Sequence, residues 1–133
     1  MRWKTVSWYN NRKRYFELDR LKRLIDFANR SRIVFIVEGK RDELALKKFG
    51  FLNVVSISGK SCERVVNEIL KNNFKEVTIA TDFDEEGEIL RFKLRFLLQK
   101  HKIKINSFYL NFLKRFKIVK IEELNSLLKE IFQ

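Results

Sequence analysis

The chain has 133 residues and a formal net charge of +12, from 29 Lys and Arg residues against 17 Asp and Glu residues. Its one cysteine, Cys62, and one histidine, His101, exclude an internal disulfide and a zinc site built from several such side chains. No apolar run approaches the roughly 18 residues of a membrane span, and no apolar signal segment follows the N-terminus, so we expect a cytoplasmic protein without membrane contact.

The first 31 residues combine aromatic and basic side chains with an amphipathic segment. Residues 3–16 mix Trp and Tyr with Lys and Arg, which suits stacking on the bases of single-stranded nucleic acid. The alternative is that these aromatic side chains pack onto the sheet. Residues 9–12 are compatible with the turn of a short hairpin. From Glu17 to Asn29, apolar residues recur at helical spacing, which predicts a helix before the first strand.

From residue 32 onwards, predicted strands alternate with predicted helices. This alternation is typical of an α/β domain with a mainly parallel four-stranded sheet flanked by helices. Gly50 is expected to end the first helix of this region, and Ser61 to cap the second. The strands are expected at Ile33–Val37, Asn53–Ile57, Glu76–Ala80 and Lys104–Leu110, and the helices at Asp42–Phe49, after Ser61, at Glu86–Lys100 and at Ile121–Phe132.

Two charged segments directly follow predicted strands. The first begins with Glu38, at the end of a five-residue apolar run, and the second spans residues 81–88. The carboxyl ends of parallel strands share one edge of a sheet, where open α/β folds bind ligands. A carboxylate at the end of a buried strand is costly unless its charge is compensated. The alternative to a functional role for Glu38 is a salt bridge to Lys40 or Arg41.

The second segment concentrates carboxylates. Asp82 and Asp84 point to the same side if the backbone stays extended, because side chains alternate along a strand. Together with Glu38 they would repel one another, and a divalent cation would relieve that repulsion. Carboxylate oxygens favour Mg²⁺ or Mn²⁺ over zinc, and Mg²⁺ suits phosphodiester chemistry. The alternative is N-capping of the next helix by an Asp, although three further Glu residues exceed what a cap needs.

The rest of the chain is strongly basic. The five acids within residues 82–88 carry −5 of the net +12, so all other residues together carry +17. A basic surface around an acidic spot indicates a polyanionic partner such as nucleic acid. The alternative is that Lys and Arg merely solvate helix faces, and the loop before Ser61 is equally compatible with a phosphate cradle or an ordinary cap. The candidate phosphate contacts are Lys40, Arg41, Lys60, Ser61, Arg91 and Arg95.

Both motifs, in this order and after strands, resemble the Toprim domain. Glu38-Gly39 follows one strand, and Asp82-x-Asp84-x-x-Gly87 follows a later one. This domain is shared by type IA topoisomerases, DnaG-type primases, OLD-family nucleases, RecR proteins and small ribonucleases that mature ribosomal RNA. In the resemblance, the two glycines would allow close approach of the backbone and tight turns.

The resemblance also implies roles for the charged residues of both motifs. Glu38 would act as general acid or base, or share the metal. Asp82 and Asp84 would be catalytic as ligands of Mg²⁺, with Glu86 assisting. Lys40 would neutralise a phosphate.

The resemblance covers about residues 32–110 and implies a Rossmann-like Toprim fold. It divides the chain into an N-terminal extension, residues 1–31, and a Toprim domain, residues 32–133, that ends in a helix. The chain has no room for the other parts of a topoisomerase, and one Cys and one His cannot build the zinc module of a primase. What remains is similar to the small stand-alone Toprim proteins of archaea and some bacteria.

The leading hypothesis is a Mg²⁺- or Mn²⁺-dependent nuclease, or a related phosphodiester-transfer enzyme, acting on RNA or DNA. The alternative is a non-catalytic Toprim module that binds nucleic acid or a protein partner in DNA repair, replication or RNA processing. A weaker hypothesis is a subunit that completes its site only with another protein.

Overall fold

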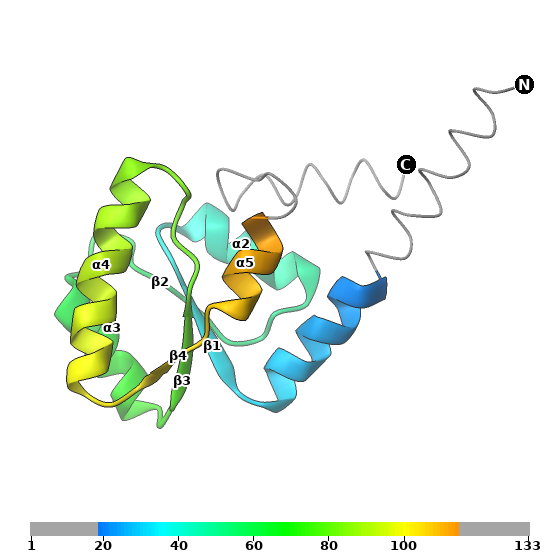
Figure 1. Cartoon of the computed structure of the whole chain (residues 1–133), viewed down its shortest axis with the longest axis horizontal. Coiled ribbons are helices and arrows are strands. Elements are labelled where there is room, and N and C mark those ends of the chain that lie inside the picture. The colour runs from blue at the N-terminus through cyan, green and yellow to red at the C-terminus, as the bar shows by residue number, and fades with distance from the viewer. Residues whose placement is uncertain (1–18, 115–133) are drawn as a thin grey trace, which may run out of the picture.

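The computed structural model describes residues 19–114 of the chain as a four-stranded parallel sheet flanked by helices (Figure 1). The strand order is β2–β1–β3–β4. The elements are an N-terminal helix over residues 19–30, β1 (Ile33–Val37), α2 (Lys40–Phe49), β2 (Val54–Ser56), α3 (Cys62–Lys71), β3 (Glu76–Ile79), α4 (Glu85–Lys100), β4 (Lys104–Ile105) and α5 (Phe108–Lys114).

Strand β1 is buried on both of its faces. Ile33, Phe35 and Val37 contact one hydrophobic core, whereas Val34 and Ile36 contact the other. Parallel pairing with β2 on one side and β3 on the other removes both strand edges from solvent. A strand in this position has to be apolar along its whole length, which explains the unbroken β-branched and aromatic run.

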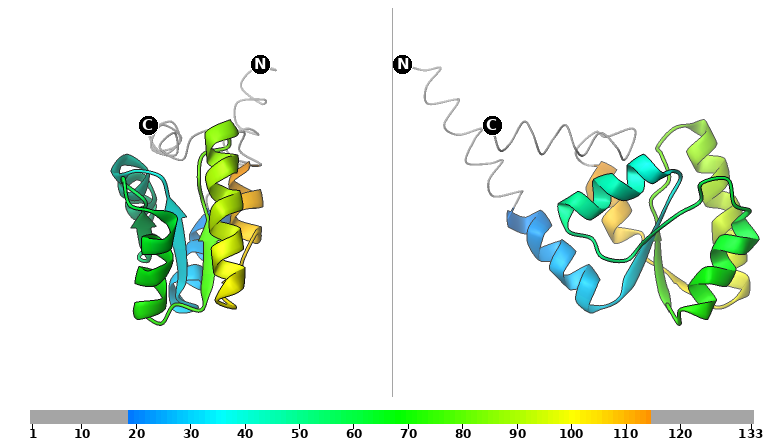
Figure 2. Two further views of the ribbon diagram at one scale, coloured as in Figure 1. Left: turned by 90° about the vertical axis from the view of Figure 1, so that its left-hand side faces the viewer. Right: turned by 180° about the vertical axis from the view of Figure 1, so that it is seen from behind.

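The helices form one layer on each face of the sheet (Figures 1 and 2). The N-terminal helix, α2 and α5 cover one face, and α3 and α4 cover the other. Each fully buried large apolar side chain contributes roughly 1.5–3 kcal/mol to stability. The helical side chains of the second core include Val65, Val66 and Ile69 of α3 and Leu94 and Leu98 of α4.

The order of the strands creates a switch point between β1 and β3. From β1 the chain passes to β2 on one side, and it then returns across β1 to form β3 on the other side. Backbone bonds extend the sheet at this edge, because Ala80 N–H donates to Ile36 O at 2.8 Å and Ile57 N–H donates to Val37 O at 2.9 Å. Ligands of open α/β sheets bind outside the carboxyl ends of the strands at such a point.

The predicted α/β class, with its parallel four-stranded sheet and preceding helix, is confirmed. Strand β1 has the predicted bounds, and α2 begins at Lys40 rather than Asp42. Gly50 ends α2 with a left-handed backbone, φ 111°, which is the usual place for glycine. The Ser61 side chain accepts a hydrogen bond from Arg64 N–H at 3.2 Å and caps α3.

The strand predicted at Lys104–Leu110 is wrong beyond Ile105. Asn106 Nδ2 donates to Glu76 Oε2 at 2.7 Å, which fixes the end of β4 against β3. Asn106 Oδ1 accepts from Phe108 N–H at 2.9 Å, and this Asx turn leads the chain out of the sheet into α5. The apolar residues that followed β4 in the sequence are therefore helical.

Tyr109 shows why the residues after β4 are apolar although they are not a strand. Its ring packs edge-on against Phe35, with 5.5 Å between ring centroids. Its hydroxyl donates to Leu24 O at 2.9 Å in the N-terminal helix. Burial of α5 against the first core therefore produces the same apolar signal that a strand would give.

Residues 1–18 and 115–133 lie outside the described part of the chain. The helix predicted at Ile121–Phe132, the hairpin at residues 9–12 and the stacking role of residues 3–16 therefore stay predictions. No helix within residues 19–114 has both the length and the apolar character that a membrane span requires.

We expect Asn106→Ala to lower the free energy of unfolding by about 1–2 kcal/mol, because it removes both the Asx turn and the bond to Glu76. Urea unfolding followed by circular dichroism measures this loss. Asn111→Ala is the matched control, since Asn111 is exposed on α5 and the change should be nearly neutral. Equal stabilities of Asn106→Ala and the parent chain would contradict this account of where β4 ends.

Candidate functional site

Two acidic residues meet at the switch point. Glu38 directly follows β1, and Asp82 follows the neighbouring strand β3. Glu38 Oε1 accepts a hydrogen bond from the Asp82 backbone N–H at 3.2 Å. Asp82 is only 6% exposed, whereas Glu38 is half-buried. The fold therefore brings together two acids that lie far apart in the sequence.

Asp84 has a structural role at the same edge. It is the N-cap of α4, and its Oδ1 accepts a hydrogen bond from Gly87 N–H at 2.9 Å. The helix-capping role considered above for the two Asp residues is thus filled by one oxygen of Asp84. Glu85, Glu86 and Glu88 occupy the first turn of α4, where the helix dipole favours negative charge, and Glu86 is exposed to solvent.

Gly87 packs directly onto the backbone of Asp82. A Cβ at position 87 would lie 1.8 Å from Asp82 O, far inside any permitted contact. Thr81 Oγ1 donates to Gly87 O at 2.8 Å. This bond ties the residue before Asp82 to the same turn of α4. This close approach requires glycine.

Gly39 is different from Gly87. Its backbone is extended, with φ −133°, and a Cβ there would make an ordinary 3.7 Å contact with Asp42. The structure therefore gives no steric reason for glycine at position 39, contrary to our expectation of a tight turn. Asp42 is buried, and its Oδ2 accepts from Gly39 N–H at 3.0 Å, so this carboxylate supports the start of α2.

Arg91 supports residues 80–84 from their buried side. We call this segment between β3 and α4 the acidic loop. It is 9% exposed, and its guanidinium donates to Thr81 O at 3.0 Å. It also pairs with Glu88 and lies 5.7 Å from the ring centre of Phe83. Arg91 is therefore engaged within the fold, whereas Arg95 is exposed, and phosphate contact by these two candidates stays a prediction.

The other candidate phosphate contacts differ in their availability. Lys40 and Arg41 are exposed in the first turn of α2. Within residues 19–114 neither pairs with Glu38, so the salt-bridge alternative for Glu38 is not formed. Lys60 is engaged with Glu68, at 3.1 and 3.3 Å from its two carboxylate oxygens. Ser61 is occupied as the cap of α3.

Negative charge accumulates around Glu38. Burial raises the pKa of Glu38 above its usual value, and the fields of Asp82, Asp84 and Asp42 raise it further. The hydrogen bond from the Asp82 backbone opposes this shift. The charged form of Glu38 is therefore disfavoured in the absence of a compensating cation.

The carboxylates do not form a complete metal cage. No three Asp, Glu, His or Cys side chains in residues 19–114 are grouped as a metal centre, so a metal site on Glu38, Asp82 and Asp84 stays a prediction. The donors are nevertheless hard oxygens whose mutual repulsion a cation would relieve. Mg²⁺ usually takes one or two carboxylates and completes its shell with water and phosphate, so the residues present fit this ion.

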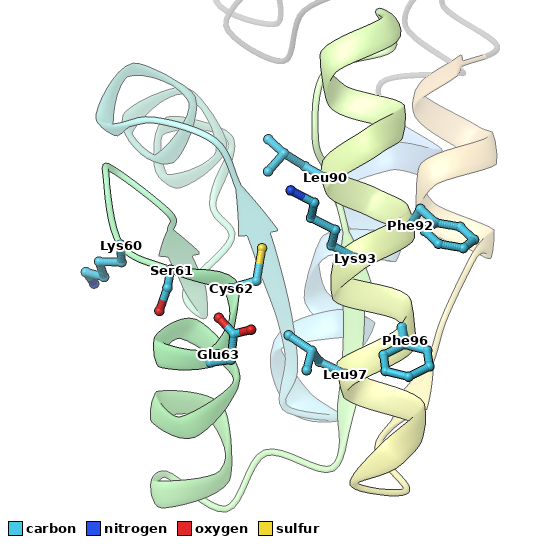
Figure 3. A pocket seen from close by; sticks show the side chains of 9 residues that line it. All are labelled: Lys60, Ser61, Cys62, Glu63, Leu90, Phe92, Lys93, Phe96 and Leu97. Carbon is cyan, nitrogen blue, oxygen red and sulfur yellow. The ribbon is translucent and has the colours of Figure 1, made fainter.

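A pocket of about 590 Å³ lies between α3 and α4 (Figure 3). The Cys62 side chain points into the space between the two helices, and burial raises the pKa of its thiol, which favours the protonated form. Sequence reasoning missed this pocket, although Phe92 and Phe96 outside the apolar stripe of α4 were a signal. It is lined by Lys60, Ser61, Cys62, Glu63, Leu90, Phe92, Lys93, Phe96 and Leu97.

Comparisons with known proteins agree with this geometry. A family model described as "Toprim domain" matches residues 33–124. A UPF0292 protein of Thermococcus sibiricus is 33% identical over 89 residues, which is 66% of this chain and 69% of that protein. The match covers 60% and 54% of the length of UPF0292 proteins from Pyrococcus furiosus and Pyrococcus abyssi.

Two further similarities concern a replication protein and a solved structure. The DNA primase DnaG of Methanocella arvoryzae is 38% identical over 66 residues, which is 50% of this chain and 13% of the primase. A solved structure of a protein from Aquifex aeolicus has a TM-score of 0.70 and 34% sequence identity, and the match covers 79% of this chain and 95% of that one.

We expect Gly87→Ala to destabilise the fold by about 2 kcal/mol or more, because its Cβ would collide with the Asp82 backbone. Gly39→Ala makes the same chemical change next to the same site, and it should cost less than about 1 kcal/mol. Thermal and urea unfolding of both variants measure the difference. Similar losses in the two variants would contradict the close contact between α4 and Asp82.

We also expect Glu38→Gln to raise the unfolding temperature by a few degrees at neutral pH in the absence of divalent ions. The raised pKa means that Glu38 favours the folded state only while it is protonated, and this contribution is lost as the pH rises through its folded-state pKa. The amide keeps the acceptor for Asp82 N–H but removes the charge. The advantage should shrink on acidification, when Glu38 is itself neutral.

Added Mg²⁺ should stabilise the parent chain more than Glu38→Gln, since a ligand stabilises the state that binds it. Glu43→Gln serves as the control, because it changes an exposed pair with Lys47 and should leave the unfolding temperature unchanged or slightly lower. An unfolding temperature of Glu38→Gln below that of the parent at neutral pH would show that Glu38 is not electrostatically strained.

Proposed function

Because the chain belongs to the Toprim domain family, we propose that it is a Mg²⁺-dependent enzyme that cleaves or transfers phosphodiester bonds of RNA or DNA. Toprim domains occur in nucleases, primases and topoisomerases, and they typically bind Mg²⁺. The observation that carries the proposal is the contact between Glu38 and Asp82 across the switch point. It joins the two family motifs at the edge where α/β sheets bind ligands.

In this proposal Glu38, Asp82 and Asp84 hold Mg²⁺, and Glu86 assists from the first turn of α4. The bound ion would supply charge stabilisation to a phosphate group. Glu38 would act as general acid or base, because burial and the neighbouring carboxylates raise its pKa above that of an ordinary glutamate. The Asp82 backbone N–H orients its carboxylate.

The residues below the acidic loop keep the carboxylates in place. Gly87 allows α4 to begin against Asp82, and Thr81 ties the loop to the helix. Arg91 donates to Thr81 O from the buried side. Such fixed support limits the reorganisation that a reaction requires.

Basic residues around the edge would bind the nucleic acid. Lys40 and Arg41 are exposed beside Glu38, and Arg95 is exposed on α4. Lys60 could join them only by leaving Glu68. The net charge of +12 supports a polyanionic substrate.

The second candidate function is a non-catalytic module that binds nucleic acid or a protein partner in repair, replication or RNA processing. Two observations favour it. Asp84 already uses one oxygen to cap α4, and residues 19–114 hold no complete metal-binding group. A site that binds Mg²⁺ weakly would still bind nucleic acid through its basic surface.

A cleavage assay with end-labelled RNA and DNA, in Mg²⁺ or Mn²⁺, tests the proposal. We expect Asp82→Asn and Asp84→Asn to lower the cleavage rate about 100-fold or more, and Glu38→Gln to act similarly. Asp84→Asn is a sharp test because Asn caps helices as well as Asp does, so folding should be retained. Glu43→Gln is the matched acid-to-amide control and should cleave normally.

Cleavage that is unchanged in Asp82→Asn and Asp84→Asn would overturn the enzymatic proposal. Absence of cleavage by the parent chain, together with binding that weakens steeply as salt increases, would favour the non-catalytic module. Absence of both would contradict both candidate functions.

A further inference from the structure

The outward face of α4 carries exposed apolar side chains where a solvated helix would be polar. Leu94 and Leu98 point into the core and are fully buried. Ile89, Phe92 and Phe96 are 53%, 75% and 66% exposed, and at about 100° per residue they lie opposite the buried positions. We call the row formed by these three residues, two of which are aromatic, the aromatic ridge. Core packing does not account for them.

Cations border the aromatic ridge on both sides. Lys93 and Lys100 lie along the side nearer α3, and Arg95 lies along the other side. All three are exposed, and α4 holds no acid after Glu88. Figure 3 shows Lys93 directed toward α3, with Phe92 and Phe96 on the opposite flank of the helix. The rings are thus accessible between Lys93 and Lys100 on one side and Arg95 on the other.

The ridge starts close to the edge of the sheet that carries Glu38, Asp82 and Asp84, which we call the acidic edge. Helix α4 begins after Asp84, and at 1.5 Å per residue Phe92 lies about 12 Å further along the helix axis and Phe96 about 18 Å. The pocket between α3 and α4 runs beside the ridge and is lined on this side by Leu90 and Leu97. A nucleic-acid strand bound along α4 would therefore extend toward the carboxylates near the start of the helix.

We propose that the outward face of α4 binds single-stranded nucleic acid. Phe92 and Phe96 stack on bases, while Lys93, Lys100 and Arg95 contact the phosphates on either side. The inference rests on the proposed function for the class of partner, and it adds that the bases are unpaired. Exposed rings beside cations bind single strands in this way, whereas duplex bases are already stacked on one another.

Charge argues against a second copy of the chain on this face. In a two-fold symmetric contact the same patch faces itself, and the cations beside Phe92 and Phe96 would meet other cations. The described part of α4 beyond Glu88 has no carboxylate to pair with them. A polyanion can pair with the cations on both sides of the ridge at once.

Binding is tested by fluorescence anisotropy with the full chain and labelled oligonucleotides of about 16 nucleotides, in EDTA so that no cleavage occurs. The same sequence is used as a single strand and as a blunt duplex. The variant Phe92→Leu with Phe96→Leu keeps apolar side chains but removes the rings. It should bind the single strand about tenfold more weakly or worse, and the duplex with little change.

Phe27→Leu is the matched control, because Phe27 is 55% exposed on the N-terminal helix, which packs on the other face of the sheet. It should leave single-strand binding unchanged. Lys93→Gln with Lys100→Gln should lower the dependence of affinity on salt while the rings stay in place. Unfolding temperatures verify that all variants are folded, as expected for exposed positions.

Equal single-strand binding by the ring variant and the parent would overturn the inference. So would a ring variant that changes only the sedimentation mass, or only the binding to vesicles of anionic lipid. The outcome is separable from that of the proposed enzyme. Ring-dependent binding without cleavage supports this inference and contradicts the chemistry, whereas cleavage without ring-dependent binding does the reverse.

Discussion

A strand without a solvent-facing side can place its first charge only where it leaves the sheet. Strand β1 is such a strand, since both of its faces and both of its edges are covered. The first polar side chain after it, Glu38, is therefore held at the carboxyl edge. The neighbouring strand β3 delivers Asp82 to the same edge, and the backbone of Asp82 bonds to Glu38. The remainder of the site depends on this meeting of two chain segments.

The acidic edge is electrostatically unfavourable, and the surrounding structure compensates for it. Gly87 brings the start of α4 against Asp82, so the partial positive charge of the helix N-terminus faces the carboxylates. Arg91 adds a buried positive charge beneath the loop. These interactions hold acids together that repel one another, which is common where a fold gives up stability for function.

Sequence could predict the fold class and the motif residues because each depends on a local pattern. The β-branched run of β1 and the two acidic segments that follow strands can be recognised without tertiary information. The role of Arg91 was not predictable, because its burial depends on the carbonyl of Thr81 in another segment. The end of β4 was missed because Tyr109 packs against the core, and a buried strand and a buried helix both give such an apolar pattern. Only the turn at Asn106 distinguishes the helix from a continued strand.

The distribution of charge along α4 separates residues that stabilise the helix from residues that need another explanation. Acids in its first turn and Lys100 in its last turn follow the helix dipole, and they would be expected of any stable helix. The dipole explains neither cations in the middle of the helix nor exposed rings between them. Lys93 and Phe92 add nothing to the core, and large exposed rings are costly in water. Helix stability does not explain their presence on α4, whereas the proposed binding of nucleic acid does.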